Sequence, residues 1–229
     1  MARVRFTITM SLDGYVAGPH QTVEHPLGEH GEELHQWAFA TRTMRAMHGM
    51  EGGATDPDDD ALAESFRNLG ATIMGRHMFG GGEGPWGPWR GWWGENPPYH
   101  HPVFVLTHHP RKPLEMEGGT VFHFVTTGIR DALEAALHAA RGKDVHVAGG
   151  ADVAQQYLKA GLIDDMELHV VPVLLGSGAR LFENTDGRQG AYELAGVVST
   201  PAASHYRYRR SQSDSRSARP RSGFRSSSS

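Results

Sequence analysis

The chain has 229 residues, of which 38% are hydrophobic and 21% charged, and its formal net charge is −4. This composition is typical of a globular protein with a sizeable core. The absence of cysteine excludes a disulfide framework, a thiolate zinc site, an iron–sulfur cluster and a cysteine nucleophile. With no secretory leader pattern and no run near the roughly 20 apolar residues that span a bilayer, we expect a cytoplasmic protein without membrane contact.

In chain order, the residue pattern alternates strands with helices up to about residue 160 and is rich in strands after it. Val4, Phe6 and Ile8 alternate with polar residues, which indicates a first strand. We expect strands at residues 3–10, 71–74, 102–106, 120–125, 145–147, 166–173, 191–199 and 204–209. We expect helices at residues 32–47, 56–68, 129–140 and 152–160. This order favours an α/β fold, with a mainly parallel sheet, helices on both faces and an antiparallel edge.

Nothing before residue 208 divides the chain, so we expect one domain over residues 1–208. Residues 209–229 contain six arginines, nine serines and one aspartate and almost nothing apolar, which predicts a disordered tail. The tail is either an idle extension or a basic arm for an acidic partner. Nucleic acid is an unlikely partner on this pattern, because no second basic patch accompanies the tail.

One predicted strand runs directly into two glycines and then a helix. Gly149 and Gly150 let a ligand approach the backbone closely, and the helix starting near Ala151 presents free N–H groups that suit a phosphate. The run is neither the G-x-G-x-x-G fingerprint nor a Walker loop. On its own it is equally compatible with an ordinary tight turn.

Two further strands end in residues that suit phosphate. Gly75 is followed by Arg76, whose planar and permanent charge matches a phosphate monoester, and by His77. After the strand 102–106 come the polar residues Thr107, His108 and, close behind, Arg111. Because ligands of open α/β sheets bind beyond the carboxyl ends of the strands, these ends predict a phosphorylated nucleotide. The alternative is three unrelated surface turns.

The segments SLDGYVAG, MGRHMF, VFVLTHHP, HVAGGADVAQQYLKAGLIDDMELHVVPVLLGSGARLFE and HYRYR together resemble the dihydrofolate reductase-like family. Within it, the chain is most similar to the reductase domain of bacterial riboflavin biosynthesis and to small stand-alone bacterial proteins that share that domain. The likeness covers residues 3–209. It implies a three-layer α/β/α sandwich around a mainly parallel, mixed sheet with antiparallel C-terminal strands, and NADPH as the cofactor.

The resemblance also implies roles for individual residues. The loop from Thr9 to Gly18, with Val16 and Ala17, would border the nicotinamide. Gly75, Arg76 and His77 would lie near the adenosine 2′-phosphate or the pyrophosphate. Thr107 and His108 would face the adenosine phosphate side, and Gly149, Gly150 and Ala151 would hold the pyrophosphate.

The sequence departs from the family pattern at three points. Met78 stands where a hydroxyl residue is common, the Trp-rich segment 80–102 has no counterpart in dihydrofolate reductase, and the H-x-E motif of a zinc deaminase is absent. The chain therefore corresponds at most to a reductase half.

Two carboxylates are candidates for catalysis. Glu33 occupies a place comparable with the catalytic carboxylate of the folate enzyme, and an apolar pocket would raise its pKa and let it donate a proton. Asp13 ends the SLD-Gly turn on the presumed nicotinamide side. The plainer interpretations are a surface glutamate in a first helical turn and an ordinary Asp-Gly turn.

The histidines do not indicate a metal site. His20, His25, His30 and His35 recur every five residues, whereas helical zinc ligands favour spacings of three or four. The Trp-rich segment predicts a cover over a pocket, an interface or packing on its own domain. Together with the apolar strand 166–173, presumed near a sheet edge, it leads us to expect a homodimer.

These observations predict an NADPH-dependent reductase that transfers hydride to a small heterocyclic or carbonyl substrate, such as a pterin or pyrimidine. The alternative is a nucleotide-binding protein of the same fold without catalysis, such as a sensor.

Overall fold

The computed structural model describes residues 2–183 and 192–211. Most of the predicted disordered tail, residues 212–229, lies outside the described residues. Its first two residues do not belong to a tail. Arg209 and Arg210 complete the last strand, and Arg210 Nη2 donates a 2.8 Å hydrogen bond to Asp164 Oδ1.

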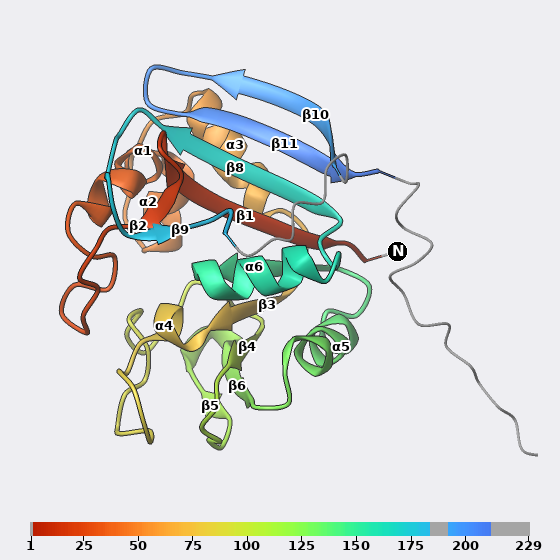
Figure 1. The fold of residues 1–229 in the computed structure, drawn as a ribbon. Helices are drawn as coiled ribbons and strands as arrows, with labels where there is room; N and C mark the ends of the chain where they lie inside the picture. Colours follow the sequence, from red (N-terminus) through yellow and green to blue (C-terminus); the bar gives the residue numbers. More distant parts are fainter. Residues whose placement is uncertain (1, 184–191, 212–229) are drawn as a thin grey trace, which may run out of the picture.

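One large sheet organises the described residues, with strands in the order β10-β11-β8-β1-β7-β3-β4-β6-β5 (Figure 1). Its six central strands run parallel: β8 (Asp165–Val171), β1 (Val4–Ser11), β7 (Asp144–Gly149), β3 (Leu69–Gly75), β4 (Pro102–Leu106) and β6 (Val121–Val125). The outer strands are antiparallel: β10 (Tyr192–Ser199), β11 (Ser204–Arg210) and β5 (Leu114–Glu115). The predicted fold class, a mainly parallel mixed sheet with antiparallel C-terminal strands, is confirmed.

Helices cover both faces of this sheet (Figure 1). On one face lie α5 (Ile129–Ala139) and α6 (Ala151–Lys159), which contact β3, β4 and β7. On the other lie η1 (Gly31–His35), α1 (Gln36–Phe39), α2 (Arg42–Met47) and α3 (Pro57–Phe66). The main core forms under α5 and α6, where Phe6, Ile73, Val145, Val147 and Tyr157 are fully buried.

The predicted helix 32–47 is wrong as a single element, because it divides into η1, α1 and α2. Thr41 causes the second break. Its backbone is extended, its hydroxyl donates to the Ala38 carbonyl at 2.7 Å, and the same oxygen accepts from the Met44 amide at 3.2 Å. A threonine that caps a new helix in this way ends the preceding one.

The helix predicted from the aspartate run is present as α3, but it ends before the expected residue. Asp56 caps its start, since its carboxylate accepts from the amides of Asp58 and Asp59 at 3.1 Å. The helix ends at Phe66, so Gly70 does not stop it. Gly70 lies in β3, and a Cβ there would meet the Ala140 carbonyl oxygen at 2.6 Å, so this glycine lets the end of α5 approach the sheet.

The sequence pattern did not predict a short pair of strands. The strand β2 (Tyr15–Ala17) pairs with β9 (Ala179–Arg180) in a separate two-stranded sheet. Three-residue and two-residue strands are too short to show a periodicity. Also unpredicted are α4 (Arg76–Phe79), which begins directly after β3, and the short helix η2 (Glu117–Gly119).

The Trp-rich segment packs on its own domain. Trp86, Trp89 and Trp93 contact a core cluster that includes the fully buried Phe79 and Phe122. Of the three interpretations left open by the sequence, this is the one that the contacts support for most of the segment.

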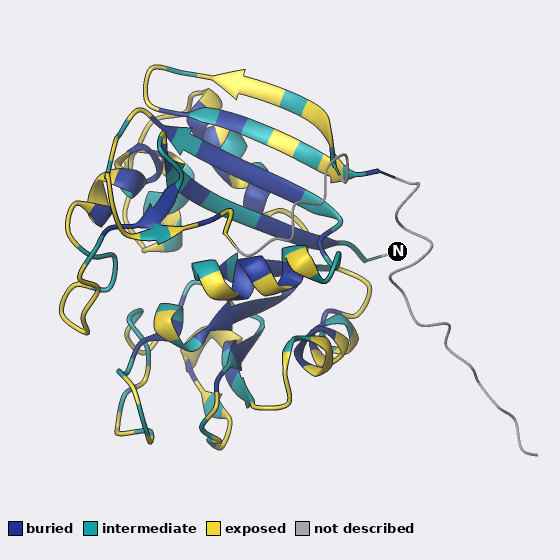
Figure 2. Cartoon of the chain, viewed as in Figure 1, coloured by how far each residue is buried: buried dark blue, intermediate teal, exposed yellow. Residues whose placement is uncertain are grey.

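The strand that we placed at a sheet edge is internal. β8 lies between β1 and β11, and Met166 and Leu168 are buried (Figure 2). The exposed edge belongs to β10, which shows little burial along its length and carries the exposed side chains Leu194, Val197 and Val198 (Figure 2). Of the apolar run expected at an edge, the part in β8 is therefore buried inside the sheet, while Leu174 in the segment after it is exposed.

Candidate functional site

The carboxyl ends of β3 and β7 meet at one edge of the sheet. Met74 pairs with Gly149, and a Cβ on Gly75 would lie 3.7 Å from the Gly150 nitrogen and 2.9 Å from Cγ2 of Val153. Only a residue without a side chain fits at Gly75 without moving its neighbours. Two of the three phosphate-compatible strand ends predicted from the sequence are thus brought together.

Open space lies in front of the glycine pair. Gly149 has a φ of +117°, which favours glycine, and a Cβ there would contact only Ile8 Cδ1, at 3.7 Å. At Gly150 a Cβ would meet no atom within 4 Å. The nine-residue α6 begins at the half-buried Ala151, so the free N–H groups of its first turn face this edge.

Arg76 carries the clearest sign of an absent partner. The Nε, Nη1 and Nη2 atoms of its guanidinium are all buried and, within the described residues, none has a hydrogen-bond partner. Burial lowers the pKa of this arginine, and the charge of Glu83 opposes that shift. Buried donors left unpaired cost free energy, so this cation is a candidate for holding an anion.

A tryptophan ring supports this cation from the Trp-rich segment. The Arg76 Cζ atom lies 3.9 Å from the centre of the Trp86 ring. The Trp86 Nε1 donates a 2.7 Å hydrogen bond to the His109 carbonyl. A second guanidinium, that of Arg111, has its Cζ 5.2 Å from the centre of the same ring. Its Nη1 is buried and has no hydrogen-bond partner among the residues that the structure describes.

The predicted residues after β4 have different roles. Thr107 is buried, and its hydroxyl oxygen accepts from the His109 amide at 3.1 Å, which shapes the turn that carries the His109 carbonyl. His108 and His77 are exposed. Thr107 therefore positions the loop, while the two histidine side chains remain predicted ligands without a described contact.

The first loop is divided between the two faces of the sheet. Thr9 is buried on the face of α1, where its hydroxyl accepts from Trp37 Nε1 at 3.3 Å, so its side chain faces away from the glycine pair. Val16 and Ala17 are buried in β2, and Val16 packs in the main core. The residues of β1 on the glycine side are the half-buried Ile8 and Met10, which the strand alternation could have indicated.

Asp13 holds two loops together. Its carboxylate accepts from the Ser11 hydroxyl at 2.6 Å and from the amides of Leu175 and Gly176 at 3.2 and 2.7 Å. The hydrogen bond from Ser11 is the main cause that lowers the pKa of Asp13 below its usual value. A carboxylate that stays ionised and is fully engaged does not suit proton donation, so these contacts disfavour the catalytic role.

Glu33 does not lie in an apolar pocket, which corrects the premise for its role. It is exposed in η1, with 46% of its side chain accessible, and its Oε1 is 3.0 Å from Nδ1 of His30. The apolar surroundings that the catalytic role requires are therefore not found around this side chain.

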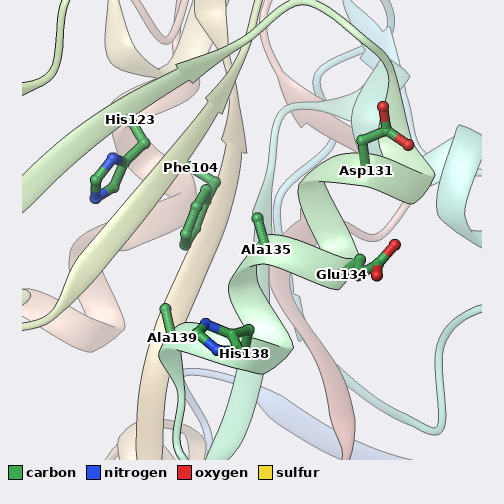
Figure 3. Close-up of a pocket in the computed structure, with 7 residues that line it drawn as sticks. All are labelled: Phe104, His123, Asp131, Glu134, Ala135, His138 and Ala139. Carbon is green, nitrogen blue, oxygen red and sulfur yellow. The ribbon is translucent and has the colours of Figure 1, made fainter.

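The described residues place no set of three or more histidine, aspartate or glutamate side chains where they could hold a metal ion. No helix among them is long and apolar enough to cross a membrane. A shallow cavity of about 500 Å³ lies between α5 and the strands β4 and β6 (Figure 3). Its floor includes Phe104, whose ring stacks on that of His123 at 5.1 Å, while Asp131 and Glu134 point away from it. This cavity lacks the glycines and the arginines of the sheet edge.

Sequence reasoning missed Trp86 as part of this edge, because it considered Trp86 only as one of several tryptophans. Arg111 was already among the phosphate-compatible residues predicted after β4. No local pattern links residues 76, 86 and 111, because the fold alone brings these loops together.

The mainly parallel α/β sheet with antiparallel C-terminal strands has the fold of the dihydrofolate reductase-like class. The family model of the RibD C-terminal domain matches residues 2–206, and the chain belongs to that family. The family includes pyrimidine reductases that use NADH or NADPH.

Among curated proteins, the chain is 39% identical over 59 residues to the uncharacterized protein YwjB of Bacillus subtilis (strain 168). This match spans 26% of the chain and 33% of YwjB, so it covers about a third of that relative.

Solved structures show the same fold. The chain is similar to a protein of Shewanella sp. PV-4 provisionally assigned to riboflavin biosynthesis, with a TM-score of 0.61, 21% identity and coverage of 92% of this chain and 99% of that one. A pyrimidine reductase-like protein of Corynebacterium diphtheriae NCTC gives a TM-score of 0.51 at 13% identity, with 92% of each chain covered. The third structure is a diaminohydroxyphosphoribosylaminopyrimidine deaminase/5-amino-6-(5-phosphoribosylamino)uracil reductase of Thermotoga maritima. Its TM-score is 0.53 at 13% sequence identity, and the match covers 92% of this chain but 57% of that one.

Proposed function

We propose that the protein is an NADPH-dependent reductase that transfers hydride to a small heterocyclic substrate, with a pyrimidine as the favoured class. One observation carries the cofactor part: the Arg76 guanidinium is buried and unpaired at the edge where Gly75 meets the glycine pair. The pyrimidine class is supported by family membership and by the names of two structural relatives.

The residues at the edge fit a dinucleotide with a phosphate on its ribose. The free amides at the start of α6 and the open space before Gly150 suit a pyrophosphate. Arg76 supplies a cation whose donors the protein leaves free. Ile8 and Met10 offer apolar surface beside Gly149 for a flat ring.

When bound, the nicotinamide ring supplies the hydride, and the chain supplies orientation. Asp13 would act there as a positioning residue, since it ties the loop after β1 to the amides of Leu175 and Gly176. Arg180 Nε donates to the Tyr15 hydroxyl at 3.2 Å, which joins β9 to β2 at the same end. These contacts fix the loops that border the presumed nicotinamide side.

A second candidate is a nucleotide-binding protein without catalysis. It is favoured by the state of the two predicted catalytic carboxylates, because Asp13 is ionised and engaged and Glu33 is exposed. Binding and turnover must therefore be measured separately.

The binding test is a titration of intrinsic fluorescence with NADPH. Gly150→Asp places a negative charge in the open space before the glycine pair, and we expect affinity to fall at least tenfold, about 1.4 kcal/mol. Gln156→Asp is the matched control, because it adds the same charge to an exposed position of the same helix. Equal binding by Gly150→Asp and the control, with both variants folded, would place the cofactor elsewhere.

The turnover test follows the loss of NADPH absorbance with pyrimidines, pterins and small carbonyl compounds. Oxidation in the presence of a pyrimidine supports the reductase. Tight NADPH binding with no oxidation across these classes supports the non-catalytic alternative.

A further inference from the structure

We propose that a hydrogen-bonded chain of four side chains, Asp58, His205, His169 and Ser65, is a latch that holds α3 on the sheet at neutral pH. In mild acid this latch releases α3 while the rest of the domain stays folded. The inference does not depend on the proposed function. It gives a role to two buried histidines that lie on the face of the sheet opposite the glycine pair.

The chain begins and ends on α3, which lies behind β8 and β11 in the view of Figure 1. In the first turn of α3, Asp58 Oδ1 is 2.8 Å from His205 Nε2 of β11. His205 Nδ1 is 2.8 Å from His169 Nδ1 of β8, and His169 Nε2 is 3.4 Å from Ser65 Oγ in the last turn of α3. All four residues are buried. The chain therefore connects both ends of one helix to two neighbouring strands.

Polar contacts, more than apolar packing, hold α3 in place. Of its four buried residues, only Leu62 is apolar. Within the described residues, no side chain of α3 belongs to the main core under α5 and α6. The residues that flank the helix, 48–56 and 67–68, are exposed. Because a helix of this length is marginal in water without its packing, α3 should unfold once it is released from the sheet.

The two histidines cannot both be protonated while the chain is closed. The Asp58 carboxylate accepts a 2.8 Å hydrogen bond from the Thr200 hydroxyl and one from His205, so His205 Nε2 carries a hydrogen. At 2.8 Å, only one of the two facing Nδ1 atoms can carry a hydrogen, and one ring therefore stays neutral. A second protonated ring would place two N–H groups and two like charges against each other.

Charged and titratable groups surround the pair on every element packed against it. They are Asp58 and Glu64 of α3, Arg5 of β1, His146 of β7, Glu167 of β8 and Arg207 of β11. The buried Arg5 is 3.4 Å from Glu167, so part of the negative charge near the pair is already balanced. Burial, and then the charge of His205, lower the pKa of His169 to about 3. His146, whose ring meets Phe66 at the end of α3, acts in the same direction, because burial lowers its pKa to about 3.

Acid therefore favours the released helix. Histidine in contact with water titrates near pH 6.5, so the released state binds protons at lower pH that the closed state does not. Each such proton favours release about tenfold at pH 5.5 relative to pH 7.5. The latch is at its most stable above about pH 6.5 and weakens as the pH falls through that value.

The experiment is amide hydrogen exchange of the full chain, read by mass spectrometry at about pH 7.5 and about pH 5.5 and corrected for the intrinsic exchange rates. We expect the opening equilibrium of α3 to rise about tenfold or more at the lower pH. At that pH the amides of α3 should be about tenfold or more less protected than those of α6, which packs on the main core. Equal protection of α3 and α6 would mean that α3 opens only with the whole domain, and would overturn the inference.

His169→Gln tests the pair itself. Glutamine binds no proton, and its amide can accept from a protonated His205, so the rise in opening should be about tenfold smaller than in the parent. His205→Gln should give the same relief from the other side, and it replaces the first variant if that one does not fold. His138→Gln is the matched control, since it removes an exposed histidine from α5 and should keep the rise of the parent. A full rise in the folded variants of the pair would show that the two histidines are not the latch.

Discussion

Two buried histidines make the stability of this fold sensitive to mild acid. His146 and His169 have 6% and 3% of their surface exposed, and burial lowers the pKa of each to about 3. The Nε2 atom of His146 is buried, and no described residue forms a hydrogen bond with it. His169 Nδ1 lies 2.8 Å from Nδ1 of His205, a contact that has room for a single proton. At both sites, burial disfavours the protonated, positively charged form of the imidazole.

The sign and size of this pH dependence follow from the difference in histidine pKa between the folded and the unfolded chain. In the unfolded chain these histidines titrate near pH 6.5, so between about pH 6.5 and pH 3 it binds protons that the folded chain does not. Stability is therefore complete above about pH 6.5 and falls as the pH decreases. Each histidine removes about 2 kcal/mol by pH 5, or about 4 kcal/mol together, against a total of about 5–15 kcal/mol for a typical domain.

The measurement is urea unfolding at several values between about pH 7.5 and pH 5, a window that lies above the titration of the carboxylates. His146→Leu removes one of these groups, and we expect the loss of unfolding free energy over this window to shrink by about 2 kcal/mol. Unfolding free energy that stays flat to about pH 5, or an unchanged slope in the variant, would refute the burial argument.

Two further predictions concern packing and assembly. Tyr157 is fully buried and its hydroxyl donates to the Ile129 carbonyl at 2.7 Å, so Tyr157→Phe should cost about 1 kcal/mol and lower Tm by about 2–4 °C in a thermal melt. We still propose a homodimer, now through the edge strand β10, whose exposed Leu194 and Val197 leave an unpaired edge. Light scattering should give a mass about twice the chain mass of 25.0 kDa. Val197→Asp should lower this mass toward that of a single chain. A single-chain mass for the parent protein would contradict the proposed dimer.

The parts of the site that the sequence predicted are those with a local cause. Gly75 ends a strand that is buried along most of its length, and Arg76 follows it. The glycine pair precedes a helix with clear periodicity, so each could be placed at a strand end. Because ligands bind at the carboxyl ends of parallel strands, these strand ends were predicted to form one site. The structure brings Gly75 and Gly150 together at this edge as expected.

The parts that the sequence could not predict depend on which face a side chain takes and on what neighbouring loops supply. Thr9 and Ile8 are neighbours in a strand, so their side chains point to opposite faces of the sheet. Thr9 contacts Trp37, whereas Ile8 lies next to Gly149. Asp13 looked like a free turn carboxylate, but besides the nearby Ser11 it binds the amides of Leu175 and Gly176, which lie more than 160 residues away. Such long-range partners leave no trace in the local pattern.

The Trp-rich segment shows how packing and binding can be one property of the same residues. Its rings bury Phe79 and Phe122, which accounts for most of its apolar surface without a second chain. The same packing fixes the Trp86 ring between Arg76 and the loop of Arg111. Both guanidinium groups therefore contact one indole ring that the surrounding aromatic residues hold in place. The stability of the segment and binding at this edge should therefore change together when Trp86 is replaced.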